Sequence, residues 1–411
     1  MATELATAME VGEYAAEAAK TAMTSALSKF SGEPHLVLLH LSRSVDIEKA
    51  LKVIREELPD VPLLGCTAAG EFTREGVEPK SVAIGMLRSE EMEFAVAFAE
   101  NVKADPEGAI RKMARDLPAG MANHEELTGI LLLDGMTDSG EKICVLASHV
   151  LGKVFGKKVR LVGGCAADDL KFESSLVIAG DEVSENAAAL CMIGSEFPLF
   201  TGLGHGHRPL SEEMTVTDVR ENVVLEVDDR PAWGVWKDLT EERGRKVAAT
   251  IGLDPDDEDS LTRVILGNYQ LGLPQAREGE FKVRFPKSVG SDGSLSFPCE
   301  IPVGTVFRIM DGSDRDDQVA AARRAVGQAV EAAESAGYDS FGGLLVFECG
   351  LRLALLGDEF TRCVENYRQL LPEVPILGWE TYGEIRMEPY QYSGFHNAST
   401  VVCLIPSEGG K

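Results

Sequence analysis

The sequence contains no run of apolar residues that approaches the roughly 20 needed for a helix to cross a bilayer. Its first four residues, Met1 to Glu4, carry no basic segment ahead of an apolar core, which argues against a secretory signal. No CxxC pair occurs among the eight cysteines, and most of them lie in or beside apolar runs. These absences predict a cytoplasmic protein whose thiols are reduced and buried, without a disulfide framework or a zinc site.

Basic residues are also scarce, because 40 Lys and Arg stand against 67 Asp and Glu and give a formal charge of −27. Such a charge repels phosphate groups, so we expect neither nucleic acid nor a membrane surface as a partner. With 411 residues, of which 44% are hydrophobic and 26% charged, the chain is typical of globular proteins and long enough for two domains.

The common catalytic signatures are missing as well. The sequence has no GxSxG elbow, no HExxH, no Walker loop and no Ser-His-Asp order, so we expect that the protein is not an enzyme. The alternative is an enzyme that uses Cys349 or Cys66 as a nucleophile. No histidine lies within a few residues of Cys349, which favours a buried and inert thiol at that position.

A duplicated stretch is the most informative feature that is present. Residues 59–72 and 372–385 align without a gap and share Pro, Val, Pro, Leu, Gly, Gly and Glu. In each copy an apolar run of strand length breaks at a glycine, and a Gly-Glu pair follows five residues later. Glycine permits close backbone approach, so such a strand end exposes amide groups and a carboxylate together. The repeat predicts two related halves that meet at one ligand site.

Two readings of the repeated carboxylates, Glu71 and Glu384, remain open. Each one either contacts a ligand or accepts hydrogen bonds from its own neighbouring backbone turn. Arg352, two residues past a glycine at another strand end, either pairs with Glu384 or holds a ligand carboxylate through its planar guanidinium group.

The chain repeats a strand–helix–strand–loop–strand unit three times, near residues 35–99, 129–193 and 343–404. In the middle unit, Asp168 and Asp169 replace the Gly-Glu pair. Residues 81–88 and 93–99 are expected to form a hairpin, and so are residues 174–179 and 187–193. We predict an α/β fold of mixed sheets flanked by helices, in two pseudo-repeated domains. The expected boundaries are an N-terminal helix over 1–30 and domains over 31–228 and 229–411.

Two histidine-containing segments are candidates for further roles. His205 and His207 lie among glycines, and one histidine is enough to hold haem iron from one side. The alternative is a turn in which one imidazole is hydrogen-bonded. His396 and Asn397 precede the last strand and are placed to line a pocket, unless Asn397 bonds its own backbone two residues on.

These motifs together resemble the FIST family, a sensory protein family with an N-terminal and a C-terminal part. The resemblance is carried by five segments, at residues 65–71, 163–168, 349–352, 378–384 and 395–397. A Gly-x-Arg-Pro segment that the family also shows is present at residues 206–209. The resemblance implies the sensing of small ligands, with amino acids as the proposed class, coupled to signal transduction. It also implies an alternative, since some bacterial members are haem-bound nitric oxide sensors that regulate a histidine kinase.

We therefore expect a cytoplasmic sensor of an amino acid or similar polar metabolite, which signals through a separate protein such as a histidine kinase. No cofactor is expected, with haem on His205 or His207 as the alternative. The expected ligand-binding residues are Cys66, Thr67, Gly70, Glu71, Asp168, Arg208, Cys349, Arg352, Tyr382, Gly383, Glu384, His396 and Asn397.

Overall fold

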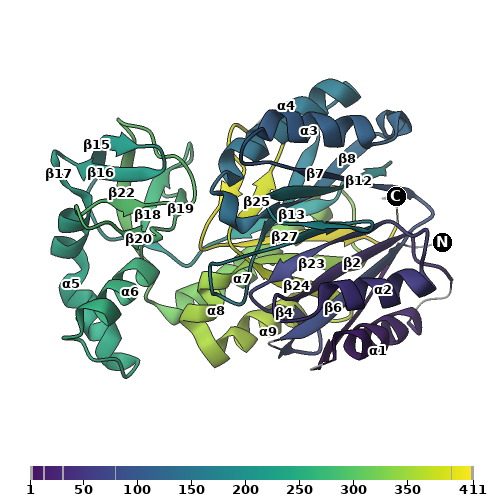
Figure 1. Ribbon diagram of the computed structural model, residues 1–411, viewed down its shortest axis with the longest axis horizontal. Coiled ribbons are helices and arrows are strands. Elements are labelled where there is room, and N and C mark those ends of the chain that lie inside the picture. The colour runs from purple at the N-terminus through teal and green to yellow at the C-terminus, as the bar shows by residue number, and fades with distance from the viewer. Residues whose placement is uncertain (1–2, 13, 30–31, 79, 390, 409–411) are drawn as a thin grey trace.

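The computed structural model describes residues 3–12, 14–29, 32–78, 80–389 and 391–408, and most of them build three units of one design (Figure 1). Each unit runs strand, helix, strand, helix, strand and, after a detour, a last strand. The first unit comprises β1 (Glu4–Val11), α1 (Ala15–Leu27), β2 (Leu36–Ser42), α2 (Ile47–Glu57), β3 (Leu63–Ala68) and β6 (Ser81–Arg88).

The second and third units follow the same order. The second comprises β7 (Met92–Glu100), α3 (Pro106–Asp116), β8 (Glu126–Asp134), α4 (Gly140–Phe155), β9 (Arg160–Ala166) and β12 (Ala187–Ser195). The third comprises β13 (Phe200–Gly204), α7 (Arg315–Ser335), β23 (Phe341–Cys349), α8 (Gly350–Leu356), α9 (Thr361–Leu370), β24 (Ile376–Thr381) and β27 (Thr400–Pro406). In each unit the two strands around the second helical segment are parallel, and the last strand runs antiparallel to the first of them.

The detour before the last strand of each unit is a β-hairpin that completes the six-stranded sheet of another unit. These three hairpins are called the exchanged hairpins below. From the first unit, β4 (Glu71–Thr73) and β5 (Val77–Glu78) join β24. From the second, β10 (Val177–Ala179) and β11 (Glu182–Ser184) join β3, and from the third, β25 (Glu384–Met387) and β26 (Phe395–His396) join β9. The three units are therefore locked together in a cycle.

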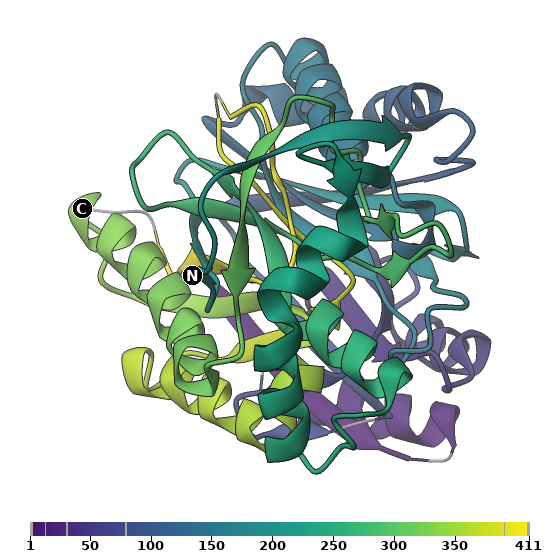
Figure 2. The same ribbon diagram turned by 90° about the vertical axis from the view of Figure 1, so that its left-hand side faces the viewer.

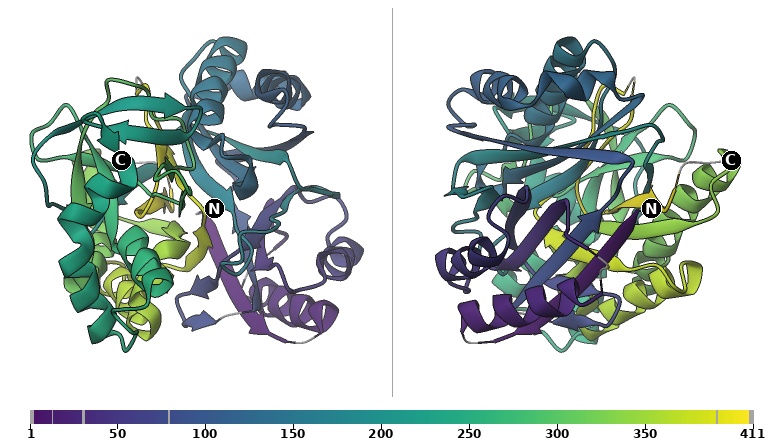
Figure 3. Two further views of the ribbon diagram at one scale, coloured as in Figure 1. Left: turned by 60° about the vertical axis from the view of Figure 1, so that its left-hand side comes forward. Right: turned by 90° about the vertical axis from the view of Figure 1, so that its right-hand side faces the viewer.

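The core lies on both faces of these sheets. The parallel strands read as almost continuous apolar runs because both of their faces are buried. One apolar cluster has members from all three six-stranded sheets, and separate clusters lie beneath the helix pairs α1/α2, α3/α4 and α7/α9. Figure 3 shows these helix pairs around the outside of the sheets.

An additional domain, here called the inserted domain, separates β13 from α7 within the third unit and projects from the body (Figures 1 and 2). It contains β14 (Arg208–Pro209), β15 (Met214–Arg220), β16 (Val223–Val227), β17 (Arg230–Pro231), α5 (Ala232–Thr250), α6 (Glu258–Asn268), β18 (Tyr269–Pro274), β19 (Phe281–Arg284), β20 (Ser288–Val289), β21 (Leu295–Ser296) and β22 (Val306–Asp311). Its nine-stranded sheet packs on these helices around its own core, which includes Trp236, Phe297 and Phe307.

The predicted fold class, mixed sheets flanked by helices in a two-domain chain, is confirmed. The helix predicted for the first 30 residues is wrong in its first part, because Glu4–Val11 forms a strand along β6; residues 1, 2, 13 and 30 lie outside the described part of the chain. The boundary expected between residues 228 and 229 lies between β16 and β17, which pair with each other.

Both expected hairpins are also wrong. The strands β6 and β7 belong to different sheets, and so do β10 and β12. Alternating or continuous apolar residues identify a strand, but they do not say which strand lies beside it. Among the described residues, no helix combines the length and apolarity needed to span a membrane.

Candidate functional site

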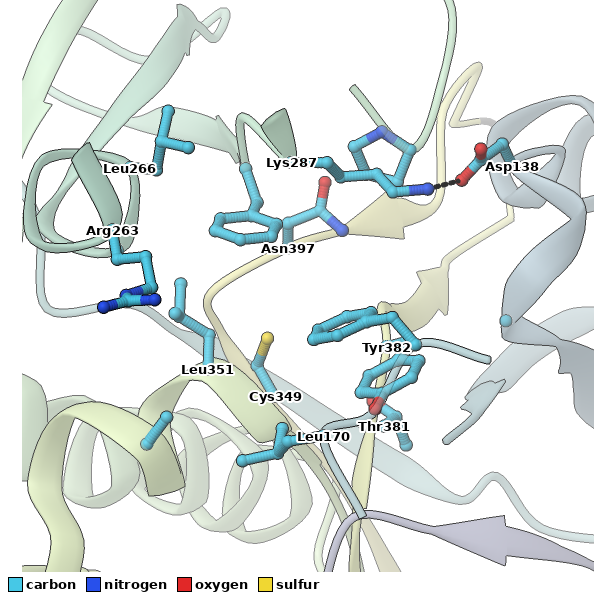
Figure 4. Close-up of a pocket in the computed structure, with 16 residues that line it drawn as sticks. Asp138, Leu170, Arg263, Leu266, Lys287, Cys349, Leu351, Thr381, Tyr382 and Asn397 are labelled. Atoms are coloured by element: carbon cyan, nitrogen blue, oxygen red, sulfur yellow. Dashed lines mark hydrogen bonds and ion pairs between the residues drawn. The ribbon is translucent and has the colours of Figure 1, made fainter. Parts of the chain in front are cut away.

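A cavity of about 300 Å³ lies between the three-unit body and the inserted domain (Figure 4). The body contributes residues at the carboxyl ends of strands: Gly135 and Asp138 after β8, Leu170 and Phe172 after β9, Cys349 at the end of β23, Thr381 and Tyr382 at the end of β24, and Asn397 before β27. The helix α8 adds Leu351 and Ala354, and the inserted domain adds Arg263, Leu266, Gly267, Phe285, Lys287 and Pro298. The volume is at the lower end of small-molecule pockets, and ligands of α/β proteins bind at carboxyl strand ends.

The side-chain oxygen of Asn397 is a polar atom of the cavity wall that lacks a hydrogen-bond donor in the described part of the chain. Its side chain points into the cavity (Figure 4), only 3% of the residue is exposed, and its Oδ1 atom accepts no hydrogen bond from the described residues. A buried amide oxygen without a donor is costly and rare. Asn397 is therefore the residue whose geometry calls for a bound group; it lines a pocket, and its contact with a ligand stays a prediction.

The loop after β9 is held in an unusual backbone conformation by Asp168. The φ angles of Asp169, Leu170 and Phe172 are 55°, 63° and 59°, a region that non-glycine residues seldom adopt. The carboxylate of Asp168 accepts hydrogen bonds from the backbone amides of Phe172, Glu173 and Ser174 at 2.8, 2.6 and 2.8 Å. Leu170 and Phe172 thereby reach the cavity.

Tyr382 supports the same loop from the other side. Its hydroxyl donates to Oδ1 of Asp168 at 2.5 Å, and the ring of Phe172 stacks on the Tyr382 ring with 4.3 Å between the centroids. Burial raises the pKa of Asp168, but the hydrogen bonds from Tyr382 and the three amides outweigh it, so that its pKa is lower than usual. Asp168 positions the cavity wall, whereas the sequence predicted direct ligand contact.

We expect Asp168→Ala to release this loop and to lower the free energy of unfolding by about 1–3 kcal/mol, because three amide donors lose their acceptor. Hydrogen exchange should show the amides of residues 172–174 exchanging at least about tenfold faster. Asp181→Ala is the control, since this exposed acid lies in the turn between β10 and β11. Unchanged exchange in residues 172–174 would contradict the role given to Asp168.

The cysteines follow the prediction of reduced, buried thiols, since all eight are free and buried. Cys349 lines the cavity, yet burial and the nearby Glu384 carboxyl raise the pKa of its thiol well above the usual value. Cys66 is fully buried, with its Sγ atom 3.4 Å from Nδ1 of His40, and burial raises its pKa as well. A protonated thiol is a poor nucleophile, so neither position favours the cysteine-enzyme alternative.

The repeated glutamates have equivalent structural roles and do not line the cavity. Oε2 of Glu71 accepts from Oγ of Ser81 at 2.7 Å, and Oε2 of Glu384 accepts from Oγ of Ser399, also at 2.7 Å. Each bond starts at the first residue of an exchanged hairpin. It ends at the serine that begins, or directly precedes, the last strand of the same unit. Both carboxyls are fully buried, so the ligand contact predicted for them is corrected to this internal link.

Arg352 is likewise internal. It is fully buried on α8, where it forms an ion pair with Glu348, and its Nη1 and Nη2 atoms donate to the side chain and backbone of Gln318 at 2.8 Å each. Glu348 also accepts from Tyr367 and Thr400 at 2.8 and 2.7 Å. Both expected roles of Arg352, pairing with Glu384 and holding a ligand, are replaced by this pair.

The remaining predicted residues do not line the cavity. Thr67 accepts from the amide of Leu176 and so connects the first two units, and Arg208 on β14 is exposed and pairs with Asp317 at 2.5 Å. His396 is buried on β26. The two glycines allow close packing: a Cβ atom on Gly70 would lie 3.2 Å from Glu380, and one on Gly383 (φ 143°) would lie 2.3 Å from Phe395.

Of the predicted residues, Cys349, Tyr382 and Asn397 therefore meet in the cavity. Sequence reasoning missed the rest of the wall, which comes partly from the body and partly from the inserted domain, above all Arg263, Phe285 and Lys287. These residues belong to an ordinary helix and a strand end, so no local motif distinguishes them.

The glycine-histidine segment proves to be a packing motif. Cβ atoms on Gly202, Gly204 and Gly206 would lie 1.8, 2.2 and 2.5 Å from the backbone of α7, so only glycine lets the two backbones approach so closely. The Nε2 atom of His205 lies 3.0 Å from the carbonyl oxygen of Phe281, and burial lowers the pKa of His205 to about 4.

This segment does not fit haem. The Phe281 carbonyl blocks the ring nitrogen of His205 through which iron would bind, and the backbone at Gly312 packs directly on the ring of His207. Neither histidine lines the cavity, and the described residues contain no group of three metal-ligating side chains.

Comparisons with known proteins point to one family. A profile of the FIST N domain matches residues 35–230 and a profile of the FIST C domain matches residues 242–387, so that the gap between them falls in the inserted domain. The uncharacterized protein MJ1623 of Methanocaldococcus jannaschii is 25% identical over 197 residues, which span 46% of this chain and only 37% of that protein.

Among solved structures, a cyanuric acid hydrolase from A. caulinodans aligns with 99% of this chain and 100% of its own at 7% identity, with a TM-score of 0.35. A second cyanuric acid hydrolase structure gives 7% identity and a TM-score of 0.33 over the same shares of the two chains. Similarity at this level carries no argument about fold or activity.

Proposed function

Because this chain belongs to the FIST family, whose domains are associated with sensing and signal transduction, we propose that it senses a small ligand in the cavity beneath the inserted domain. The observation that carries the proposal is the buried and unpartnered Oδ1 atom of Asn397, a residue of the cavity wall. An amino acid or a similar small metabolite is the expected ligand class.

The position of the cavity also provides a way to signal. Its walls belong to two bodies, and the inserted domain is covalently joined to the third unit through the segments that follow β13 and precede α7, while Arg284 and Lys282 hydrogen-bond to Phe395 and Ser393 of that unit. Two ion pairs connect it to the start of α4 and the turn before it, Arg284 with Glu141 and Lys287 with Asp138, each at 2.6 Å. A ligand that contacts both bodies favours one relative pose, since its affinity differs between poses.

In this proposal a separate protein reads the change in pose. A histidine kinase is the partner class that the family resemblance implies. The protein itself acts without catalysis, which agrees with the protonated state expected for Cys349 from its raised pKa.

Filling the cavity tests the proposal. A Cβ atom on Gly267 would meet nothing closer than 3.8 Å, so Gly267→Phe should project a ring into the cavity without backbone collision. In a thermal-shift screen against amino acids and small metabolites, a ligand at a hundredfold its dissociation constant adds about 2.7 kcal/mol and should raise the Tm of the wild type by several degrees.

The same ligand should leave the Tm of Gly267→Phe unchanged. Gly234→Phe is the matched control, because Gly234 lies on α5 of the same domain, has no atom within 4 Å of an added Cβ, and is not part of the cavity wall. A ligand that stabilises Gly267→Phe as much as the wild type would place the sensing site elsewhere.

A further inference from the structure

We propose that the cavity selects an organic anion, specifically an aromatic carboxylic acid that carries an N–H or O–H donor, over an amine or a zwitterion. This inference rests on the proposed function for the site itself and narrows the ligand class, because it favours a small metabolite without an ammonium group over an amino acid. It follows from the charge, the shape and the one open hydrogen-bonding position of the wall.

Of the three charged side chains in the cavity wall, one cation has no ion-pair partner in the described part of the chain. Its charged side chains are Arg263, Lys287 and Asp138, and the last two neutralise each other in an ion pair of 2.6 Å. Arg263, an exposed residue, donates to Oγ of Ser260 at 3.1 Å and forms no ion pair with a carboxylate of the described residues. Asp257, the acid at the start of the same helix, accepts from the amide of Ser260; this hydrogen bonding and, to a smaller extent, the charge of Arg263 lower the pKa of Asp257.

No carboxylate in the wall is left for an ammonium group. Asp138 is engaged by Lys287, and Asp168, behind the wall, has both oxygens occupied by Tyr382 and three amides. Glu384 lies behind Thr381, and burial raises the pKa of Glu384 to about 8, which keeps it neutral at pH 7. In a chain with a formal charge of −27, a cavity with an unpaired cation is opposite in sign to its surroundings.

The shape of the wall fits a flat apolar body. Phe172 lies stacked on Tyr382, and Phe285 enters from the inserted domain. Leucines at positions 170, 266 and 351 and the ring of Pro298 complete the apolar surface. Aromatic rings pack well in such surroundings, by offset stacking or by edge-to-face contact.

The open hydrogen-bonding position is an acceptor. Oδ1 of Asn397 has no donor among the described residues, and an amide oxygen can only accept. The hydroxyl of Thr381 is already directed to Glu348 and Glu384. The ligand must therefore bring an N–H or O–H group of its own, in addition to the carboxylate that pairs with Arg263.

Four indole probes separate these requirements on the full-length protein. Indole-3-acetate has the ring, the N–H donor and the negative charge; indole-3-acetamide lacks the charge, tryptamine reverses it, and L-tryptophan is a zwitterion. By isothermal titration we expect indole-3-acetate to bind at least about tenfold tighter than each of the other three. Indole-3-acetamide and tryptamine lack the carboxylate that pairs with Arg263, and the ammonium group of L-tryptophan meets no carboxylate in the wall.

Two variants attribute the preference to residues. Arg263→Gln should reduce the affinity for indole-3-acetate about tenfold and leave that for indole-3-acetamide unchanged, whereas Arg277→Gln, an exposed arginine of the same domain, should change neither. Asn397→Asp, which places a carboxylate at the open acceptor, should weaken the acid more than the amide.

The outcomes distinguish this inference from the proposed function. If tryptamine or L-tryptophan binds as tightly as the acid, or if Arg263→Gln leaves the ratio of acid to amide unchanged, the preference for an anion is refuted. Loss of that binding in Gly267→Phe would at the same time support the cavity as the sensing site. If none of the four probes binds, the inference about aromatic acids is refuted, and the metabolite screen with Gly267→Phe still decides the proposed function.

Discussion

Arg352→Ala is expected to lower the free energy of unfolding by about 3–5 kcal/mol, the largest loss that we predict for a single substitution in this protein. Arg352 and Glu348 are both fully buried, and the substitution leaves the carboxylate of Glu348 without its counter-charge. It also opens a space among Gln318, Cys363 and the helix α8. Denaturation by guanidinium, followed by fluorescence and circular dichroism, measures the loss.

Two further variants show whether the unpaired charge is responsible. Arg352→Met combined with Glu348→Leu removes both charges together and should recover a large part of the lost stability. Arg111→Ala, which breaks an exposed pair with Glu107 on α3, should cost less than about 1 kcal/mol. A double variant that is no more stable than Arg352→Ala would show that packing, and not the buried ion pair, dominates this region.

The stability of the protein should fall as the pH rises from about 5 to 8. Burial raises the pKa values of Glu71 and Glu384 from 4.5 to about 8, against the opposing hydrogen bonds from Ser81 and Ser399. In the unfolded chain both groups release their protons near pH 4.5, while in the folded protein they keep them up to about pH 8. The folded state therefore binds more protons throughout this window, and its stabilising contribution is lost as the pH rises through it.

The isosteric variants should remove this dependence. Glu71→Gln and Glu384→Gln cannot ionise, so each should raise the free energy of unfolding at pH 8 by about 1–3 kcal/mol and change it by less than about 1 kcal/mol at pH 5. Glu107→Gln, at an exposed position, is the control and should change stability little at either pH. Parallel stability curves for Glu71→Gln, Glu384→Gln and the wild type between pH 5 and 8 would refute buried, neutral carboxyls.

The duplicated Gly-Glu stretch shows how a correct sequence observation led to an incorrect role. The repeat is real, and its two copies occupy equivalent places, at the start of an exchanged hairpin. In both copies the glutamate accepts a hydrogen bond from a serine, which lies 10 residues further along the chain for Glu71 and 15 residues further for Glu384. A carboxylate that binds a ligand and one that links two strands have the same sequence pattern, and only the position of the cavity distinguishes them.

The amino-acid sequence by itself indicated a threefold repeat of strand, helix and strand and the buried thiols, because each depends on the burial of residues that are close together in the chain. It also placed Cys349, Tyr382 and Asn397 at strand ends, where the cavity lies. Only the tertiary structure decided that hairpins are exchanged between units and that Arg263, Phe285 and Lys287 of the inserted domain close the cavity. Those pairings join residues as far apart as Glu71 and Trp379, 308 residues along the chain, and the side-chain periodicity of a segment carries no information about its distant partner.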